Sequence, residues 1–301
     1  MKKSAVLLVI VVMLITPLVP AAAQENHLDP CTAGEITLLL ETLQPVTEAL
    51  DAAAESWPEE KLDWLELPVE DFVALSLTYA SIDDSLAITV ETLPACVDST
   101  LLASEYDILV SSLSLWAMQM ALFHTYEVDG DSDAPSFKDN AIFHMERVDR
   151  ITETIAAHTE ALANGEFLPE WAACTDAELT GEYVTFLRLM EGNVPLVVGE
   201  ISLITGPSSS QLLRLDTLNM MFLPDQHQNT VPACYELQML TIETYGELAD
   251  LSIFGMVTKL MTHMDKAGNT EAEAALQAIF EARWTATIQA YTKWSTPISP
   301  E

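Results

Sequence analysis

The sequence has few basic side chains. It contains 12 Lys and Arg against 46 Asp and Glu among 301 residues, which gives a formal net charge of -34. Such a field repels phosphate groups and attracts cations, so we expect neither nucleic acid nor an anionic membrane surface as a partner. Half of the residues (50%) are hydrophobic, so a chain of this length has enough apolar surface to fold around a core.

Motifs of common enzyme classes are also missing. The chain has no G-x-S-x-G nucleophile elbow, no H-E-x-x-H, no Walker A loop and no G-x-G-x-x-G, and its 10 glycines leave little for phosphate-binding loops. These absences favour a non-enzymatic protein. They do not exclude an enzyme, because catalytic groups need only converge in space.

The first 23 residues are typical of a secretory signal peptide. A basic Met1-Lys2-Lys3 precedes an apolar run from Ala5 to Leu18, and Ala21-Ala22-Ala23 supplies small residues for cleavage. The run is shorter than the roughly 20 apolar residues that a membrane span requires. We therefore expect a secreted or extracytoplasmic protein with no stable membrane span after cleavage, and an uncleaved anchor is the alternative.

Four cysteines, Cys31, Cys96, Cys174 and Cys234, follow the predicted signal peptide. An even number in an exported protein predicts two disulfides, for which three pairings are possible. No two are spaced as C-x-x-C, which argues against a zinc knuckle, a thioredoxin-like redox pair and haem attachment. Four buried free thiols are the other interpretation.

The sequence around the cysteines repeats. The residues from Cys31 (CTAGE) are similar to those from Cys174 (CTDAE), and LPAC at 93–96 is similar to VPAC at 231–234. The offsets are 174 - 31 = 143 and 234 - 96 = 138, which indicates that a block of two units was duplicated. In the first and third units Thr-x-x-Glu follows the cysteine, and this pattern predicts a capping box at a helix start.

The apolar residues recur with helical spacing and show no strand alternation. The longest stripe follows Cys96 and consists of Leu102, Tyr106, Leu109, Leu113, Trp116, Met120 and Phe123. We predict an all-α fold of eight helices in four antiparallel hairpins. Residues 24–165 would form the first helical block and residues 166–301 the second, with two hairpins in each.

The predicted topology favours one cysteine pairing. In an up-down bundle of two hairpins, the two helices that follow cysteines run parallel, so they start at the same end. This favours Cys31–Cys96 and Cys174–Cys234, while pairing between the blocks remains the alternative. We expect a ligand in the groove between the blocks, because ligands favour domain interfaces.

One acidic loop could hold a metal. Asp129, Asp131 and Asp133 alternate with other residues, as at the start of an EF-hand loop, but Ala134 replaces the required glycine and Asn140 the bidentate glutamate. A solvated acidic turn is therefore the competing interpretation.

Histidines add to this site, because His124 and Glu127 precede the loop and His144 follows it. The H-x-x-E spacing resembles part of the imelysin motif G-x-H-x-x-E, with Leu122 at the glycine position, and the resemblance covers only these residues and implies no activity. Imidazole and carboxylate ligands suit a divalent transition metal. The candidate ligands are His124, Glu127, Asp129, Asp131 and His144.

The sequence thus predicts a secreted, acidic, all-helical binding or interaction protein without cofactor or identifiable catalytic activity. Its partner would be another protein or a small molecule. The alternative is an extracytoplasmic metal-binding protein or metal-dependent hydrolase, with its site at the end of the second hairpin.

Overall fold

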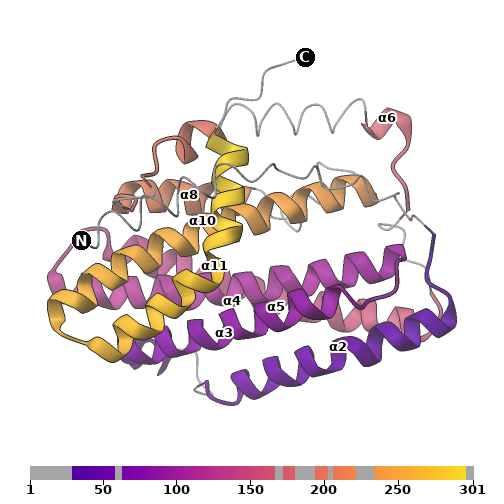
Figure 1. The fold of residues 1–301 in the computed structure, drawn as a ribbon, viewed down its shortest axis with the longest axis horizontal. Coiled ribbons are helices and arrows are strands. Elements are labelled where there is room, and N and C mark those ends of the chain that lie inside the picture. Colours follow the sequence, from indigo (N-terminus) through magenta and orange to yellow (C-terminus); the bar gives the residue numbers. More distant parts are fainter. Residues whose placement is uncertain are drawn as a thin grey trace, which may run out of the picture.

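A computed structural model describes residues 29–57, 63–166, 172–179, 194–202, 206–221 and 234–295. The predicted signal peptide lies outside these residues. Within them the chain forms helices and no β-strand, which confirms the all-α prediction (Figure 1).

Long helices dominate both halves of the chain. The first half contains α2 (Ala33–Ala54), the short 3-10 helix η1 (Asp63–Glu66), α3 (Val69–Val90), α4 (Val97–Asp129) and α5 (Ala134–Ala163). The second half contains α6 (Asp176–Glu178), α8 (Ser209–Met221), α10 (Tyr235–Ala267) and α11 (Thr270–Ser295). The helix predicted after Cys174 is described only at its start, as α6.

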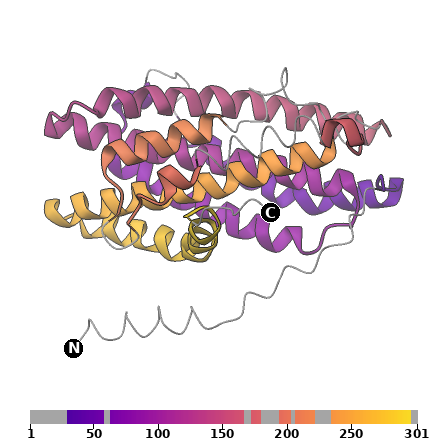
Figure 2. The same ribbon diagram turned by 90° about the horizontal axis from the view of Figure 1, so that it is seen from above.

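Helices α4 and α10 form the centre of the bundle. They pack against each other; α3 and α5 also pack on α4, and α8 and α11 on α10 (Figures 1 and 2). The Ser104 hydroxyl lies 4.0 Å from the Met239 sulfur, and the Ser112 hydroxyl lies 3.0 Å from that of Tyr245. Residue numbers rise together along both helices, so α4 and α10 run parallel.

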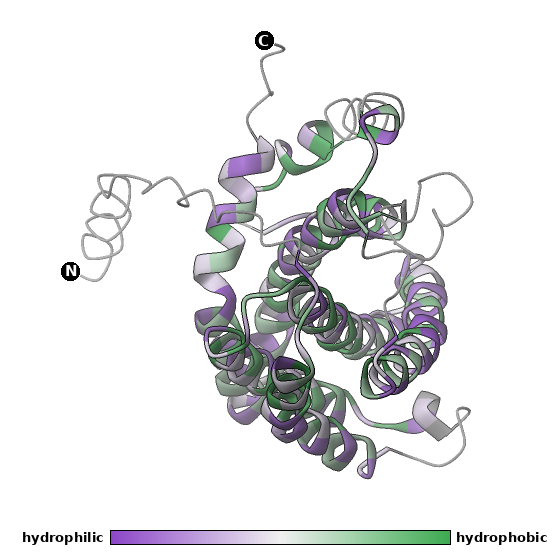
Figure 3. Cartoon of the chain, turned by 90° about the vertical axis from the view of Figure 1, so that its right-hand side faces the viewer, coloured by the Kyte–Doolittle hydropathy of each residue, from purple (hydrophilic) through white to green (hydrophobic). Residues whose placement is uncertain are grey.

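In the part of the chain that the structure describes, two helices, α3 and α4, are long and apolar enough to cross a membrane by length and composition. The apolar segment of α4 is 94% buried inside the protein, whereas that of α3 is 33% buried. A helix that is hydrophobic on all sides is buried in a protein core or in a membrane, and α4 is buried in the core of this protein. The end-on view of Figure 3 shows the helices along their axes, with hydrophobic residues concentrated in the central ones.

Two disulfides join the pairs that the topology favoured. Cys31 is bonded to Cys96 and Cys174 to Cys234. Cys96 and Cys234 are the N-cap residues of α4 and α10. Disulfides of this kind persist in oxidising compartments, so the pairs indicate an extracytoplasmic environment.

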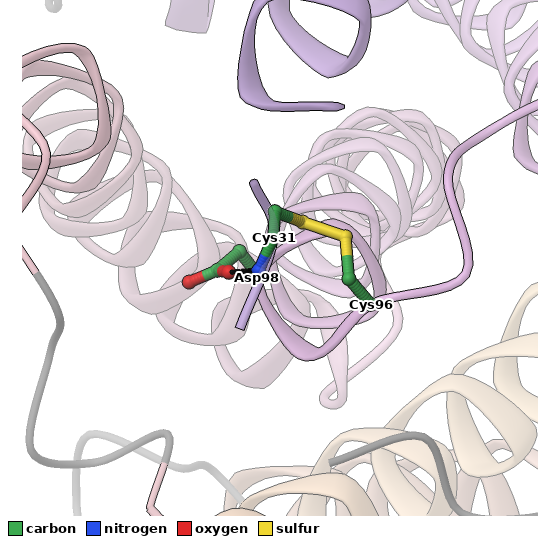
Figure 4. Close-up of side chains that lie close together, drawn as sticks. All are labelled: Cys31, Cys96 and Asp98. Carbon is green, nitrogen blue, oxygen red and sulfur yellow. Dashed lines mark hydrogen bonds between the residues drawn. A yellow bond between two sulfur atoms is a disulfide. The ribbon is translucent and has the colours of Figure 1, made fainter. Parts of the chain in front are cut away.

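Local hydrogen bonds fix the chain beside each disulfide. Both predicted capping boxes are present, at Thr32 with Glu35 and at Thr175 with Glu178. The Asp98 carboxylate accepts the backbone N–H of Cys31 (Figure 4). Glu236 does the same for Cys174, at 2.7 Å. Each disulfide is therefore reinforced by an acid from the first turn of the long helix.

Candidate functional site

A pocket of about 250 Å³ lies among helices α3, α4, α10 and α11. Its lining consists of Asp83, Asp107, Ser111, Glu243, Gly246, Glu247, Asp250 and Arg283. The first three belong to residues 24–165 and the others to residues 166–301. The pocket therefore lies between the two parts of the chain where we expected a ligand.

Arg283 connects two of the pocket's five carboxylates. Its side chain is 6% exposed. Its Nη1 donates to Asp250 Oδ1 at 2.6 Å, and its Nη2 lies 3.1 Å from Asp83 Oδ2. One guanidinium thus neutralises acids from α3 and α10, and the charge of the pocket remains negative.

Asp107 and Ser111 lie one turn apart on α4 and have no such partner. Among the described residues, neither side chain makes a hydrogen bond or an ion pair, although Ser111 is only 3% exposed. Neither Ser111 Oγ nor the Asp107 oxygens are among the fully buried polar atoms without a partner, so these oxygens are accessible from the pocket. A Cβ atom at Gly246 would lie 3.4 Å from Asp107 Oδ2, so glycine leaves space beside this carboxylate. The pocket therefore offers acceptors that the protein itself does not use.

Burial raises the pKa of two of the pocket acids. It raises the pKa of Asp107 to about 7, and repulsion from Asp83 and Asp250 adds to this effect while Arg283 opposes it. Burial also raises the pKa of Asp250 to about 6, against the attraction of Arg283. The charge of the pocket therefore changes between pH 6 and 7, without any histidine in its lining.

Replacing Asp107 by asparagine should stabilise the protein at pH 8 and leave its stability unchanged at pH 4. Between these values the folded protein retains a proton on Asp107 that the unfolded chain releases, so stability falls as pH rises. A pKa change from 3.8 to about 7 corresponds to about 4 kcal/mol, and water in the open pocket reduces this to on the order of 2 kcal/mol.

Urea unfolding of wild type and D107N at both pH values measures this difference. Glu153→Gln, at an exposed position on α5, is the control because it removes the same charge outside the pocket. Equal gains for D107N at pH 4 and pH 8 would contradict the assignment.

The candidate metal ligands lie in separate surroundings. His144 is fully buried, and its Nε2 lies 3.0 Å from Oδ1 of Asp216 on α8. The His124 ring stacks on Phe72 with centroids 5.5 Å apart, and burial lowers its pKa while Glu127 opposes this shift.

The acidic residues of the same set surround the turn after α4. Gly130 ends this helix with a φ of 70°, which a side chain would disfavour. Asp131 Oδ1 accepts the backbone N–H of Asp133 at 2.9 Å, and Asp129 Oδ2 lies 3.6 Å from Nδ1 of His263. These contacts are those of a helix end.

The five candidate ligands do not form one group. Among the described residues, the sets of three or more ligating atoms within 4.8 Å of one another contain none of these five residues. The sets that do occur are Cys31, Cys96 and Asp98, and Cys174, Cys234 and Glu236. Their sulfur atoms are already bonded in disulfides, so they do not provide thiolate ligands.

The chain was compared with family models, curated proteins and solved structures. No match was found in any of the three. Its function is therefore inferred from the acidic pocket and from the compartment that the disulfides indicate.

Proposed function

We propose that this chain is an extracytoplasmic binding protein that holds a small cation in the pocket among α3, α4, α10 and α11. The observation that carries this proposal is the pair of unpartnered acceptors, Asp107 and Ser111, in a lining with five acids and one arginine. The net charge of -34 would also concentrate cations near the protein.

The lining favours binding over catalysis. It contains no histidine or cysteine, and Ser111 and Asp107 are not hydrogen-bonded to each other. A hydrolase with a serine nucleophile needs a base within hydrogen-bonding reach of the hydroxyl. The pocket's groups instead provide fixed acceptors and negative charge.

The proposal includes the duplication, with residues 24–165 and 166–301 as the two blocks. In its support, α4 and α10 each have 33 residues and begin at a disulfide-bonded cysteine. Each ends at a left-handed glycine, Gly130 or Gly268, with a φ of 70°. The shared cap, disulfide and acid contacts are those expected of two copies of one unit. The proposed ligand site would then lie between the copies.

A thermal scan at pH 8 with a panel of cations tests the proposal. The panel contains Ca²⁺, Zn²⁺, n-butylamine and 1,4-diaminobutane, with NaCl to match the ionic strength. A cation that binds only the folded state raises the Tm with concentration. We expect such a shift for wild type and for Glu153→Gln, and its loss in D107N. If no cation in the panel shifts the wild type, the proposed function is wrong.

A further inference from the structure

The geometry points to a linear organic diamine or polyamine as the cation: one ammonium group bound by Asp107 and Ser111, the other by Glu243. This inference rests on the proposed cation-binding function and identifies the class of ligand. It assigns the site to two positive charges joined by a short apolar chain.

A metal ion does not fit the arrangement of the pocket. Calcium needs six to eight oxygen ligands and magnesium six, at about 2.0–2.6 Å from the ion. All eight lining residues are described. No three of their carboxylate oxygens lie within 4.8 Å of one another, since in the described part of the chain the sets of His, Cys and carboxylate atoms this close contain the disulfide cysteines. The acids are too far apart to surround one ion.

An ammonium group matches the unpartnered acceptors on α4. It carries three N–H donors and a single charge. Asp107 supplies a carboxylate, and Ser111 supplies a hydroxyl one helical turn away. Asp83 and Asp250 are less available, because Arg283 already binds both.

A second free carboxylate faces α4 from the neighbouring helix. Glu243 on α10 is exposed and has no hydrogen bond or ion pair with the described residues. The nearby Glu247 is occupied, because its oxygens accept from Lys293 Nζ at 2.8 Å and from Trp294 Nε1 at 2.6 Å. Asp107 and Glu243 therefore have no close ion pair, although Arg283 attracts the first and Lys293 the second from a greater distance. A ligand with two positive charges matches this pair of acids.

The size of the pocket limits the chain between these charges. A cavity of about 150 Å³ accommodates benzene, so about 250 Å³ is enough for a linear diamine with four or five methylene groups. A longer polyamine would extend past Glu243 into the solvent.

In the other proposed block, the position that corresponds to Asp107 is a tyrosine whose hydroxyl group has a hydrogen-bond partner within the protein. With the 138-residue offset of the second cysteines, Asp107 corresponds to Tyr245, and Asp250 corresponds to Ser112. The Tyr245 and Ser112 hydroxyls lie 3.0 Å apart, and the Arg147 guanidinium lies 4.0 Å from the centre of the Tyr245 ring. The Tyr245 hydroxyl thus has a partner within the protein, whereas the Asp107 carboxylate has no hydrogen bond to a described residue.

Isothermal titration calorimetry at pH 8 and constant ionic strength tests the inference with 1,4-diaminobutane, n-butylamine, Ca²⁺ and Zn²⁺. We expect the diamine to bind the wild type up to about fivefold more tightly than the monoamine, because a second ion pair at an exposed carboxylate contributes up to about 1 kcal/mol. Glu243→Gln should remove most of this difference, because it weakens the diamine much more than the monoamine. D107N should weaken both amines at least tenfold, and Glu153→Gln should change neither.

The outcomes separate the inference from the proposed function. Equal affinities of the two amines for wild type would overturn the second ammonium position. Binding of a metal ion without binding of either amine would overturn the amine assignment and leave a cation-binding protein. If none of the four probes binds, both proposals fail. Circular dichroism of each variant shows that a lost affinity does not come from unfolding.

Discussion

Replacing Arg283 by methionine is expected to lower the free energy of unfolding by about 3–5 kcal/mol at pH 8. Methionine retains much of the apolar stem and removes the charge. Asp83 and Asp250 would then face each other and Asp107 without the cation that bridges α3 and α10. An acid left unpaired at a partly buried site costs much more than the loss of a surface ion pair.

Urea unfolding followed by tryptophan fluorescence measures this loss at pH 8 and at pH 5. The loss should be smaller at pH 5. Without Arg283, the pKa values of Asp107 and Asp250 rise further, so the folded variant takes up protons there and recovers stability. Arg214→Met is the matched control, because the ion pair of Arg214 with Glu200 is exposed and should contribute less than about 1 kcal/mol. The same loss in both variants would contradict a special role for Arg283.

The sequence was sufficient for the features that depend on neighbouring residues. The helical spacing of apolar side chains predicted the long helices, and Thr-x-x-Glu located the starts of α2 and α6, because caps form within one turn. The cysteine pairs also followed from local order, since parallel helices start at the same end.

The pocket could not be predicted from the sequence in the same way. Its residues lie between positions 83 and 283, and they meet only when four helices take one relative rotation. Asp107 is one acid among 46 in the sequence. Arg283 lies seven residues after Leu276 and four before Thr287, and only the structure shows that this is the buried face of α11. A cation on a buried face predicts buried acids opposite it.

His144 shows the limit of spacing arguments for a metal site. Its position in the sequence placed it near Asp129 and Asp131. The structure instead buries it on the face of α5 that meets Asp216. A histidine on an apolar stripe needs a buried partner, and sequence alone does not show which helix supplies it.

Removing either disulfide by paired cysteine-to-alanine changes is expected to lower the free energy of unfolding by about 4 kcal/mol. The pairs close segments with sequence separations of 65 and 60 residues. The entropy of closing a loop depends on the logarithm of its length, so the two losses should be nearly equal. Urea unfolding measures them, and a reducing agent should reproduce the sum of both in wild type without affecting the double pair variant.

Loss of the first disulfide and loss of the second should affect different parts of the protein. Beyond its disulfide, α2 is held by few buried side chains, namely Leu39, Leu43, Val46 and Ala53. Without the Cys31–Cys96 bond, amide hydrogen exchange should therefore accelerate in α2 well before it does in α4, whose side chains are buried along most of its length. Loss of Cys174–Cys234 should leave exchange in α2 unchanged, because α2 contacts α3, α4 and α5. Equal acceleration of α2 and α4 in the first variant would mean that the disulfide stabilises the bundle as a whole and does not act mainly by tethering its outermost helix.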